Sequence, residues 1–276
     1  MRITYYGTAA GEGWPGVFCR CALCREARRL GGRNIRTRSQ ALVNDDLLLD
    51  LPPDNLLHAL YFGLDLSRVR YLLFTHSHSD HCYPQDLEHL REPYSHTYPG
   101  RMQVYGNKAV GREIERACGS LGGEKERFDF HVVDVGRPFP AGAYTVLPLR
   151  ADHMRDERER CHIYRIARGD KSVLYAHDTG ALPRETLDCL ARQEGKLSLV
   201  SMDCISQSHY DGHGHMGLEN AAELKEKLLE LGAADERTIW IVSHFSHNGG
   251  WLHGKMEAEA RCYGIIAAYD GMSIEF

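Results

Sequence analysis

The chemically richest part of the sequence is the segment THSHSDH at residues 75–81, which directly follows the apolar run YLLF. It offers four metal ligands within six residues: His76, His78, Asp80 and His81. Imidazole and carboxylate groups bind zinc, iron or manganese, and a tight loop can aim alternate side chains at one metal and adjacent ones at another. No role in a hydrophobic core explains this density of polar side chains. The spacing therefore predicts a metal site.

Three more candidate ligands stand just after other apolar runs. His153 lies in RADH, Asp178 lies in YAHDTG, and His244 lies in VSH after the run TIWIV. Each of these runs has the composition of a strand. We therefore expect the polar segments to form loops at one sheet edge, where functional residues are commonly found.

A second cluster consists of cysteines, in the segment CRCALC at residues 19–24. Cys19, Cys21 and Cys24 supply three thiolates, and a tetrahedral structural zinc needs one more ligand from elsewhere in the chain. The chain has nine cysteines, an odd number that suits a reduced compartment and metal binding better than a disulfide framework. Three free cysteines are the alternative.

The elements that must position these residues follow from short apolar runs that alternate with amphipathic stretches. Strands are predicted at residues 2–6, 40–43, 47–51, 71–74, 102–105, 131–135, 144–149, 162–167, 172–175, 197–202, 238–242 and 272–275. Helices are predicted at 54–62, 84–92, 108–118, 183–194, 218–231 and 255–263, with Pro84 and Pro183 in first turns. Residues 44–46 and 168–171 are typical of hairpin turns. Strand meanders mixed with single helices predict two sheets with helices outside, and residues 1–276 are most simply one domain.

Composition excludes several classes of protein. The 276 residues are 43% hydrophobic and 26% charged, as in an ordinary soluble protein. No apolar stretch suits a signal peptide or a membrane helix, so we expect a cytoplasmic protein without a membrane partner. The formal net charge of −5 argues against general affinity for nucleic acid. Residues 20–38, however, carry seven arginines against Glu26 alone, which suits either an anionic substrate or a solvated face.

The H-x-H-x-D-H string and the order of the later elements resemble the metallo-β-lactamase superfamily over essentially the whole chain. The resemblance implies an α/β fold, the four-layer αββα sandwich, with metals at the shared edge of its two sheets. It implies that Asp50, at the end of LLLD, supports the site by hydrogen bonding. His177 matches no family role and is treated as structural. The implied ligands are His76, His78 and His153 for one metal, Asp80, His81 and His244 for the other, and Asp178 as the bridge.

A narrower resemblance rests on C-x-C-x-x-C, RTRSQALV, THSHSDH, HDTGALP, MDCISQSH and SHFSH taken together. These motifs look like the phosphoribosyl 1,2-cyclic phosphate phosphodiesterases of the carbon-phosphorus lyase pathway. The resemblance implies a structural zinc loop at about residues 16–30, with the zinc held by Cys19, Cys21, Cys24 and His247. The sequence departs from that family in the charged segment 152–160 and in the histidine-rich segment 211–215.

The resemblance implies a hydrolase with two divalent metals, whether zinc, manganese or iron, and one structural zinc. Two such cations lower the pKa of a bridging water and stabilise the attacking and leaving oxygens of an in-line displacement. We therefore expect a phosphodiesterase whose partner is a small phosphorylated substrate, most simply a cyclic phosphodiester, with Asp80 and His215 as catalytic residues. His215 best matches the family's general acid, and His209 and His213 are alternatives on the same segment.

Three other functions remain open. The B protein of pyrroloquinoline quinone biosynthesis has a similar cysteine cluster and acts in oxidation chemistry with iron. A tRNA-processing nuclease would need a basic arm that grips RNA, and no such insertion is apparent. A metal-binding scaffold without turnover is the non-enzymatic alternative. The fold alone does not choose the substrate, and the sequence leaves the oligomeric state open, a homodimer included.

Overall fold

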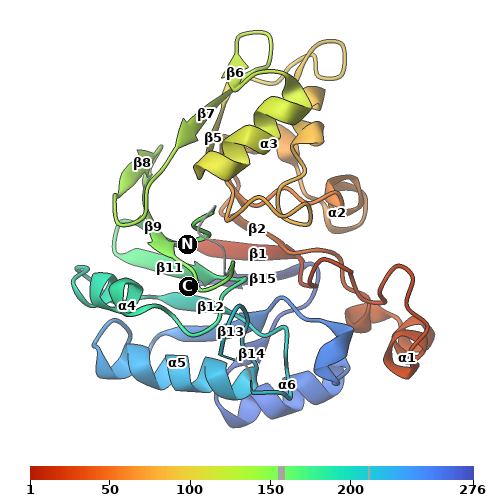
Figure 1. Ribbon diagram of the computed structural model, residues 1–276, viewed down its shortest axis with the longest axis vertical. Helices are drawn as coiled ribbons and strands as arrows, with labels where there is room; N and C mark the ends of the chain where they lie inside the picture. The colour runs from red at the N-terminus through yellow and green to blue at the C-terminus, as the bar shows by residue number, and fades with distance from the viewer. Residues whose placement is uncertain (155–158, 211) are drawn as a thin grey trace.

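Two β-sheets packed face to face form the centre of the molecule in the computed structural model, which describes residues 1–154, 159–210 and 212–276 (Figure 1). Among these residues, the first sheet has eight strands in the order β15-β1-β2-β3-β4-β5-β7-β6. They are β1 (Arg2–Gly7), β2 (Gln40–Val43), β3 (Leu47–Leu49), β4 (Tyr71–Leu73), β5 (Met102–Gly106), β6 (Gly122–Gly123), β7 (Phe128–Val132) and β15 (Met272–Glu275).

The second sheet has seven strands in the described residues, in the order β14-β13-β12-β11-β10-β9-β8. They are β8 (Phe139–Ala141), β9 (Tyr144–Arg150), β10 (His162–Arg168), β11 (Lys171–Ala176), β12 (Leu199–Asp203), β13 (Ile239–Ser243) and β14 (Ile266–Ala267). The strands β11 to β14 are parallel to one another. Parallel strands end at the same edge of a sheet, so the loops after β11, β12 and β13 are neighbours.

Helices cover the outer faces of both sheets (Figure 1). The helices α2 (Asn55–Phe62) and α3 (Lys108–Cys118) and the 3₁₀ helix η3 (Pro84–Leu90) lie on the first sheet. The helices α4 (Arg184–Ala191), α5 (Leu218–Glu230) and α6 (His253–Cys262) lie on the second. The helix α1 (Ala22–Leu30) projects beside α6. The short 3₁₀ turns are η1 (Gly32–Asn34), η2 (Leu66–Arg68) and η4 (His247–Gly249).

In the described part of the chain, the core has three apolar clusters, because most central strands are buried on both faces. In β3, Leu47 and Leu49 point into the cluster between the sheets, while Leu48 points into the cluster under α3. In β10, Ile163 faces the helices that cover the second sheet, and Tyr164 faces the first sheet. This alternation follows from the two-residue period of a strand. The four layers confirm the expected αββα architecture.

The sequence predicted most elements within a few residues, and the two hairpin turns lie where they were expected, between β2 and β3 and between β10 and β11. Three predictions were wrong in detail. The strand expected at 131–135 is β7, three residues earlier, where Phe128 pairs with Met102 of β5. The helix expected at 84–92 is the 3₁₀ helix η3, and the helix expected at 183–194 ends at Ala191.

Several elements were not predicted. Helix α1 was missed because five of its nine residues are charged or cysteine, which hides an apolar period. The strands β6, β8 and β14 have only two or three residues each, too few for a periodic signal. No helix in the described part of the chain is long and apolar enough to cross a membrane.

Candidate metal centre

The predicted ligands lie at the ends of strands from both sheets. His76 follows β4 of the first sheet, while His153, Asp178 and His244 follow β9, β11 and β13 of the second. Asp178 and His244 have φ angles of 50° and 63°, in the left-handed region that non-glycine residues rarely adopt. Such backbone strain concentrates at functional sites, where the surrounding structure holds it in place.

The first ligand group consists of His76, His78 and His153. One nitrogen of each side chain lies within 4.8 Å of the other two. His153 Nε2 and His78 Nδ1 are 3.3 Å apart. Two nitrogens bound to one tetrahedral zinc at about 2.05 Å would be separated by about 3.3 Å. The group therefore has the dimensions of three ligands around one cation.

The second ligand group consists of Asp80, His81, Asp178 and His244, whose ligand atoms also lie within 4.8 Å of one another. Asp178 Oδ1 is 2.8 Å from His244 Nε2, and Asp178 Oδ2 is 2.6 Å from His81 Nε2. The same Oδ2 is 3.5 Å from His76 Nε2 of the first group. Asp178 thus lies between the two groups, at the position that the resemblance implied for a bridging ligand.

Charge is concentrated and buried at this site. Burial alone would lower the pKa of His81, but the carboxylates of Asp178, Asp80 and Asp50 raise it well above the usual value. Burial alone would raise the pKa of Asp178, but His244 and His81 hold it well below its usual range. Burial, reinforced by His81, lowers the pKa of His76 well below its usual value. The carboxylates therefore supply the negative charge that a bound cation requires.

The donor set fits a divalent metal. Among the described residues, His76 Nε2 is buried without a hydrogen-bond partner, and His81 Nε2, although 2.6 Å from Asp178 Oδ2, is not aligned for a hydrogen bond to it. Buried polar atoms are rarely left without a partner in native proteins. A cation would satisfy both nitrogens, and a set of imidazoles and carboxylates suits zinc, iron or manganese.

Asp50 has the supporting geometry that the resemblance implied. It lies directly after β3, is fully buried, and accepts a hydrogen bond from His81 Nδ1 at 2.7 Å. Thr75 donates its backbone N–H and its hydroxyl to the same carboxylate. These bonds leave His81 Nε2 as the nitrogen that faces the ligand group and fix the ring's orientation.

His177 lies beside Asp178 in sequence but belongs to the interior. Its Nδ1 is 3.0 Å from Ser39 Oγ, and its Nε2 is 2.8 Å from Ser201 Oγ. Burial lowers its pKa well below the usual value, which favours the neutral ring. Both nitrogens are thus engaged away from the ligand groups, consistent with the structural role expected for this residue.

His215 stands at the rim of the site, and Asp203 holds it there. His215 Nδ1 is 3.0 Å from Asp203 Oδ2 and 3.4 Å from Asp178 Oδ1, and its side chain is 26% exposed. Asp203 is fully buried and also accepts the backbone N–H groups of Asp178 and Met216. Sequence reasoning missed Asp203, although its position at the end of β12, like that of Asp50 after β3, was the available signal.

The other histidines of this segment lie farther out. His209 is exposed, and the side chain of His213 is 82% exposed, with Nδ1 3.4 Å from Asp152 Oδ2. Of the three candidates for a proton donor, only His215 belongs to a group of possible ligand atoms that includes Asp178. Residues 155–158 and 211, within the two segments that depart from the resembling family, lie outside the described residues.

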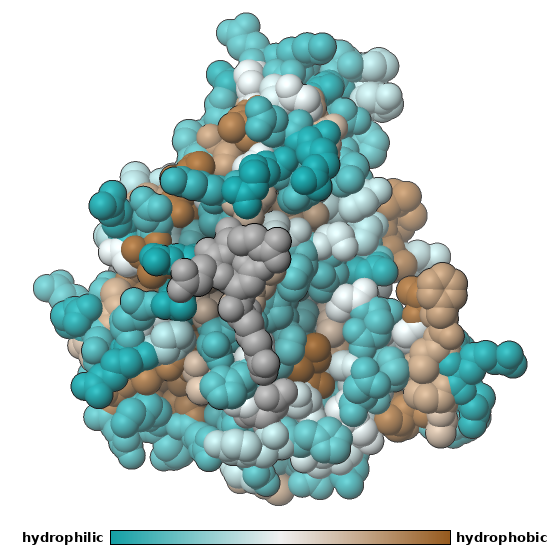
Figure 2. Space-filling view, viewed as in Figure 1, coloured by the Kyte–Doolittle hydropathy of each residue, from teal (hydrophilic) through white to brown (hydrophobic). Residues whose placement is uncertain are grey.

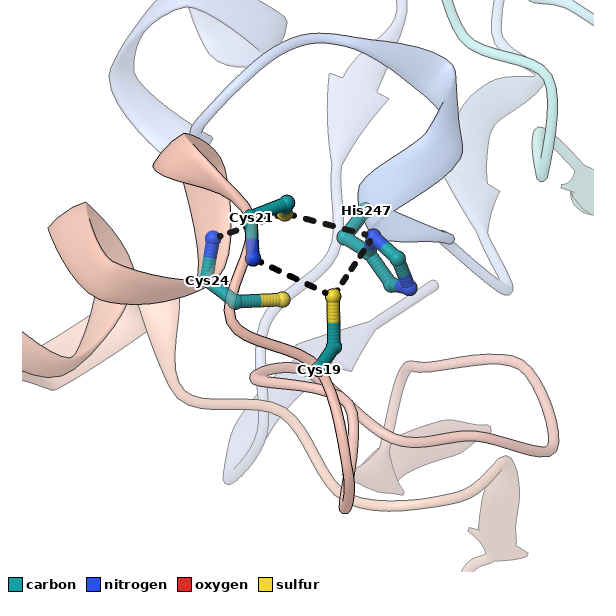
Figure 3. A group of neighbouring side chains, drawn as sticks. All are labelled: Cys19, Cys21, Cys24 and His247. Atoms are coloured by element: carbon teal, nitrogen blue, oxygen red, sulfur yellow. Dashed lines mark hydrogen bonds between the residues drawn. The ribbon is translucent and has the colours of Figure 1, made fainter.

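The cysteine cluster is a separate site. Cys19, Cys21 and Cys24 come from the loop before α1 and its first turn, and His247 comes from the segment after β13; the four side chains converge (Figure 3). His247 Nδ1 is 3.9 Å from Cys19 Sγ and 3.7 Å from Cys21 Sγ. A tetrahedral zinc would place nitrogen and sulfur about 3.6 Å apart. The four residues therefore fit the structural zinc site that was expected.

Replacing Cys21 with serine is expected to affect stability more than chemistry. A four-ligand zinc has no open position for substrate, and the free energy of binding it contributes to folding. We expect the Cys21→Ser protein to lose one zinc and to melt at least about 5 °C lower. Metal analysis and thermal melts test this, with Cys262→Ser, an exposed cysteine on α6, as the control. An unchanged melting temperature with full zinc content would remove the structural role.

The arginine-rich segment divides into structural and exposed residues. Arg36 is buried and donates to Thr8 Oγ1 and to the Ala268 carbonyl, and Arg28 donates to the Cys19 carbonyl. Part of this arginine excess therefore stabilises loops instead of facing a substrate.

The loop before α1 also exposes Val17 and Phe18, at 62% and 97%. In Figure 2 the projection at the right carries apolar side chains beside strongly hydrophilic ones.

Comparison with protein families gives a match to the beta-lactamase superfamily domain over residues 48–238, more than half of the chain. An octanoyltransferase of Porphyromonas gingivalis strain W83 is 35% identical over 85 residues. That match covers 29% of this chain and only 16% of the octanoyltransferase.

Solved structures share the architecture over the full length. A diphosphatase from the PhnP family superimposes with a TM-score of 0.73 at 22% identity, covering 100% of this chain and 97% of the other. Zinc-bound PqqB from Methylobacterium extorquens gives a TM-score of 0.73 at 16% identity, with both chains fully covered. The short form of human tRNase Z gives 0.67 at 16% identity, covering 100% and 99%. At these identities the likeness is one of fold.

Proposed function

The chain belongs to the beta-lactamase superfamily, and from this premise we propose that it is a metal-dependent hydrolase that cleaves small phosphodiesters. The observation that carries the proposal is the position of Asp178. Its two oxygens lie within 3.5 Å of histidines from both ligand groups, so this carboxylate would be shared by two cations bound there. Two metals about 3.5–4 Å apart can stabilise both the attacking and the leaving oxygen of an in-line displacement, as phosphodiester hydrolysis requires.

The residues that would hold the metals are the two groups described above. His76, His78 and His153 would bind one cation, Asp80, His81 and His244 would bind the other, and Asp178 would bind both. When bound, such a pair of cations supplies a water of lowered pKa and neutralises charge on the phosphoryl oxygens. Zinc, manganese and iron are all compatible with this donor set.

The chain's own residues would orient the substrate and supply the proton for the leaving group. Hydrolysis of a diester breaks one P–O bond and releases an alkoxide, which must be protonated. His215 lies on the rim beside Asp178, and its Nδ1 is engaged by Asp203 at 3.0 Å. Because Asp203 engages Nδ1, we assign to the other ring nitrogen, Nε2, the proton that the alkoxide receives.

A small cyclic phosphodiester, such as a phosphoribosyl cyclic phosphate, is the substrate class that we propose. The motif combination C-x-C-x-x-C, THSHSDH, HDTGALP and SHFSH supports it, as does the structural likeness to a PhnP-family diphosphatase. Because that neighbour is called a diphosphatase, phosphoanhydrides are the first competing substrate class to test.

The proposal is tested with the metal-loaded protein and a panel of substrates. We expect hydrolysis of bis(p-nitrophenyl)phosphate and preferential hydrolysis of small cyclic diesters over linear dinucleotides and nucleoside diphosphates. Phosphomonoester product is measured by phosphorus NMR with manganese- and zinc-loaded protein. A protein that retains two catalytic metals beside the structural zinc but releases no product from any diester would contradict the proposal and favour the scaffold function.

A second candidate function is oxidative chemistry of the kind associated with pyrroloquinoline quinone biosynthesis. The TM-score of 0.73 to PqqB, with both chains fully covered, is the observation that favours it. Oxygen consumption by the iron-loaded protein, measured with an oxygen electrode, separates this function from diester hydrolysis, which consumes water only.

A further inference from the structure

Glu159 is a buried acid in the charged segment that departs from the resembling family. Only 8% of its surface is exposed, and three groups donate hydrogen bonds to it. Its Oε1 accepts the Ser77 backbone N–H at 2.9 Å and the Asn107 side-chain N–H at 2.7 Å. Its Oε2 accepts the Ser77 hydroxyl. Both carboxylate oxygens are therefore occupied from within the protein.

The partners of Glu159 place it behind the first ligand group. Ser77 lies between His76 and His78, so both of its bonds to Glu159 fix the short loop that carries these two ligands. The third ligand, His153, precedes Glu159 on the same connection between β9 and β10. One carboxylate thus ties the segment that leads into β10 to the loop that carries two of the three histidines.

Asn107 connects this carboxylate to a rigid element. Its Oδ1 accepts the backbone N–H groups of Ala109 and Val110 and so caps the N-terminus of α3. Its Nδ2 donates to Glu159 and to the Arg160 carbonyl. Because the cap fixes the Asn107 side chain, Glu159 is held against α3 while it holds Ser77.

We propose that Glu159 is a positioning residue for the cation bound by His76, His78 and His153. The inference rests on the proposed metal centre but not on the identity of the substrate. Glu159 lines a cavity of about 520 Å³ together with Arg150 and Asp152. Its carboxylate is nevertheless buried and already accepts three hydrogen bonds from Ser77 and Asn107. Its effect therefore runs through the loop that it holds.

The test compares Glu159→Ala with Glu159→Gln. Alanine removes all three bonds and leaves Ser77 and Asn107 with unsatisfied donors. Glutamine keeps an acceptor for the Ser77 and Asn107 N–H groups and can donate to the Ser77 hydroxyl, which also accepts. Partners that orient metal ligands typically change metal affinity by about 10–100-fold. For Glu159→Ala we expect such a loss of affinity at one of the two proposed catalytic metal sites, the one formed by His76, His78 and His153. For Glu159→Gln we expect a metal affinity within about threefold of wild type.

The readout is metal affinity, measured by competition with a chromogenic chelator on zinc- and manganese-loaded protein. Glu185→Ala is the control, because it also removes one carboxylate but from an exposed ion pair with Arg150. A purely structural role would lower the melting temperature of Glu159→Ala without changing affinity, and that result would overturn the proposal. A loss in glutamine equal to that in alanine would indicate charge instead of position and would overturn it too.

The double variant Ser77→Ala/Glu159→Ala adds an independent check. If Glu159 acts through Ser77, the double variant should lose less metal affinity than the sum of the losses in the two single variants. The reason is that both single substitutions remove the bond between the Ser77 hydroxyl and Glu159. Full additivity would contradict the proposal. Failure of this inference can be distinguished from failure of the proposed hydrolase function. If the protein hydrolyses no diester but the variants show the expected metal affinities, the positioning role of Glu159 still stands.

Discussion

The Asp178→Ala protein is expected to lose more than about 10⁴-fold in kcat/KM on phosphodiesters, because in the proposed function the metal pair would supply most of the transition-state stabilisation. Asp178 contacts histidines of both ligand groups, so its removal affects both cation positions. It also leaves His81 and His244 without a shared carboxylate, which lowers the negative charge that attracts a cation. Metal content should fall together with turnover, and both are measured on the same preparation.

Asp188→Ala is the matched control for that experiment. Asp188 lies on α4, is partly exposed and pairs only with Arg184 in the described structure. Its replacement changes the net charge by the same amount and should leave kcat/KM within about twofold of wild type. The assignment of the metal centre would be wrong if Asp178→Ala kept wild-type turnover and full metal content. Asp80→Ala and His81→Ala should show the same loss, since both belong to the second group.

The ligand-bearing loops could be anticipated because their signal is local. Each ligand segment follows a short apolar run, and such a run buried on both faces must be a central strand. His76 after β4 and His244 after β13 are examples in which the strand end could be located to within about two residues. The distance between them could not be derived from local patterns, since the two strands belong to different sheets that only the tertiary packing brings together.

The supporting residues could not be anticipated, for a different physical reason. Glu159 lies in a highly charged segment whose composition is typical of an exposed surface. Its burial depends on hydrogen-bond donors from Ser77, 82 residues away in sequence, and from Asn107, 52 residues away. Asp203 likewise binds His215 only because the loop after β12 folds back. A long-range hydrogen bond leaves no periodicity in the sequence, so these contacts became visible only with the packed sheets.

The two clusters of ligands are joined through one short segment. His244 belongs to the second ligand group and His247 to the cysteine cluster, only three residues apart. Between them, Phe245 exchanges backbone hydrogen bonds with Thr8 and Ala10, and Ser246 donates to Glu12. The loop that contains Glu12 continues to the cysteines. A zinc bound by the cysteine cluster would therefore stabilise a loop that also packs beside the candidate metal centre.

His215→Ala is expected to reduce kcat on a diester with a poor leaving group by about 10²–10⁴-fold, the usual contribution of a general acid. An alkoxide leaving group needs a proton as the P–O bond breaks, whereas p-nitrophenolate is stable without one. Hydrolysis of bis(p-nitrophenyl)phosphate should therefore change by less than about threefold. The measurement is kcat for an alkyl or cyclic diester and for the nitrophenyl diester, at saturating metal and substrate.

His213→Ala tests the same loop from a more exposed position. The His213 side chain is 82% exposed and lies near Asp152, whereas His215 lies against Asp203 and Asp178. We expect only the His215 variant to show a loss that depends on the leaving group. The same loss in His213→Ala alone would transfer the role to that residue. Equal losses on both substrates in His215→Ala would instead indicate damage to substrate binding or metal geometry, because the chemical step with an activated leaving group requires no proton donor.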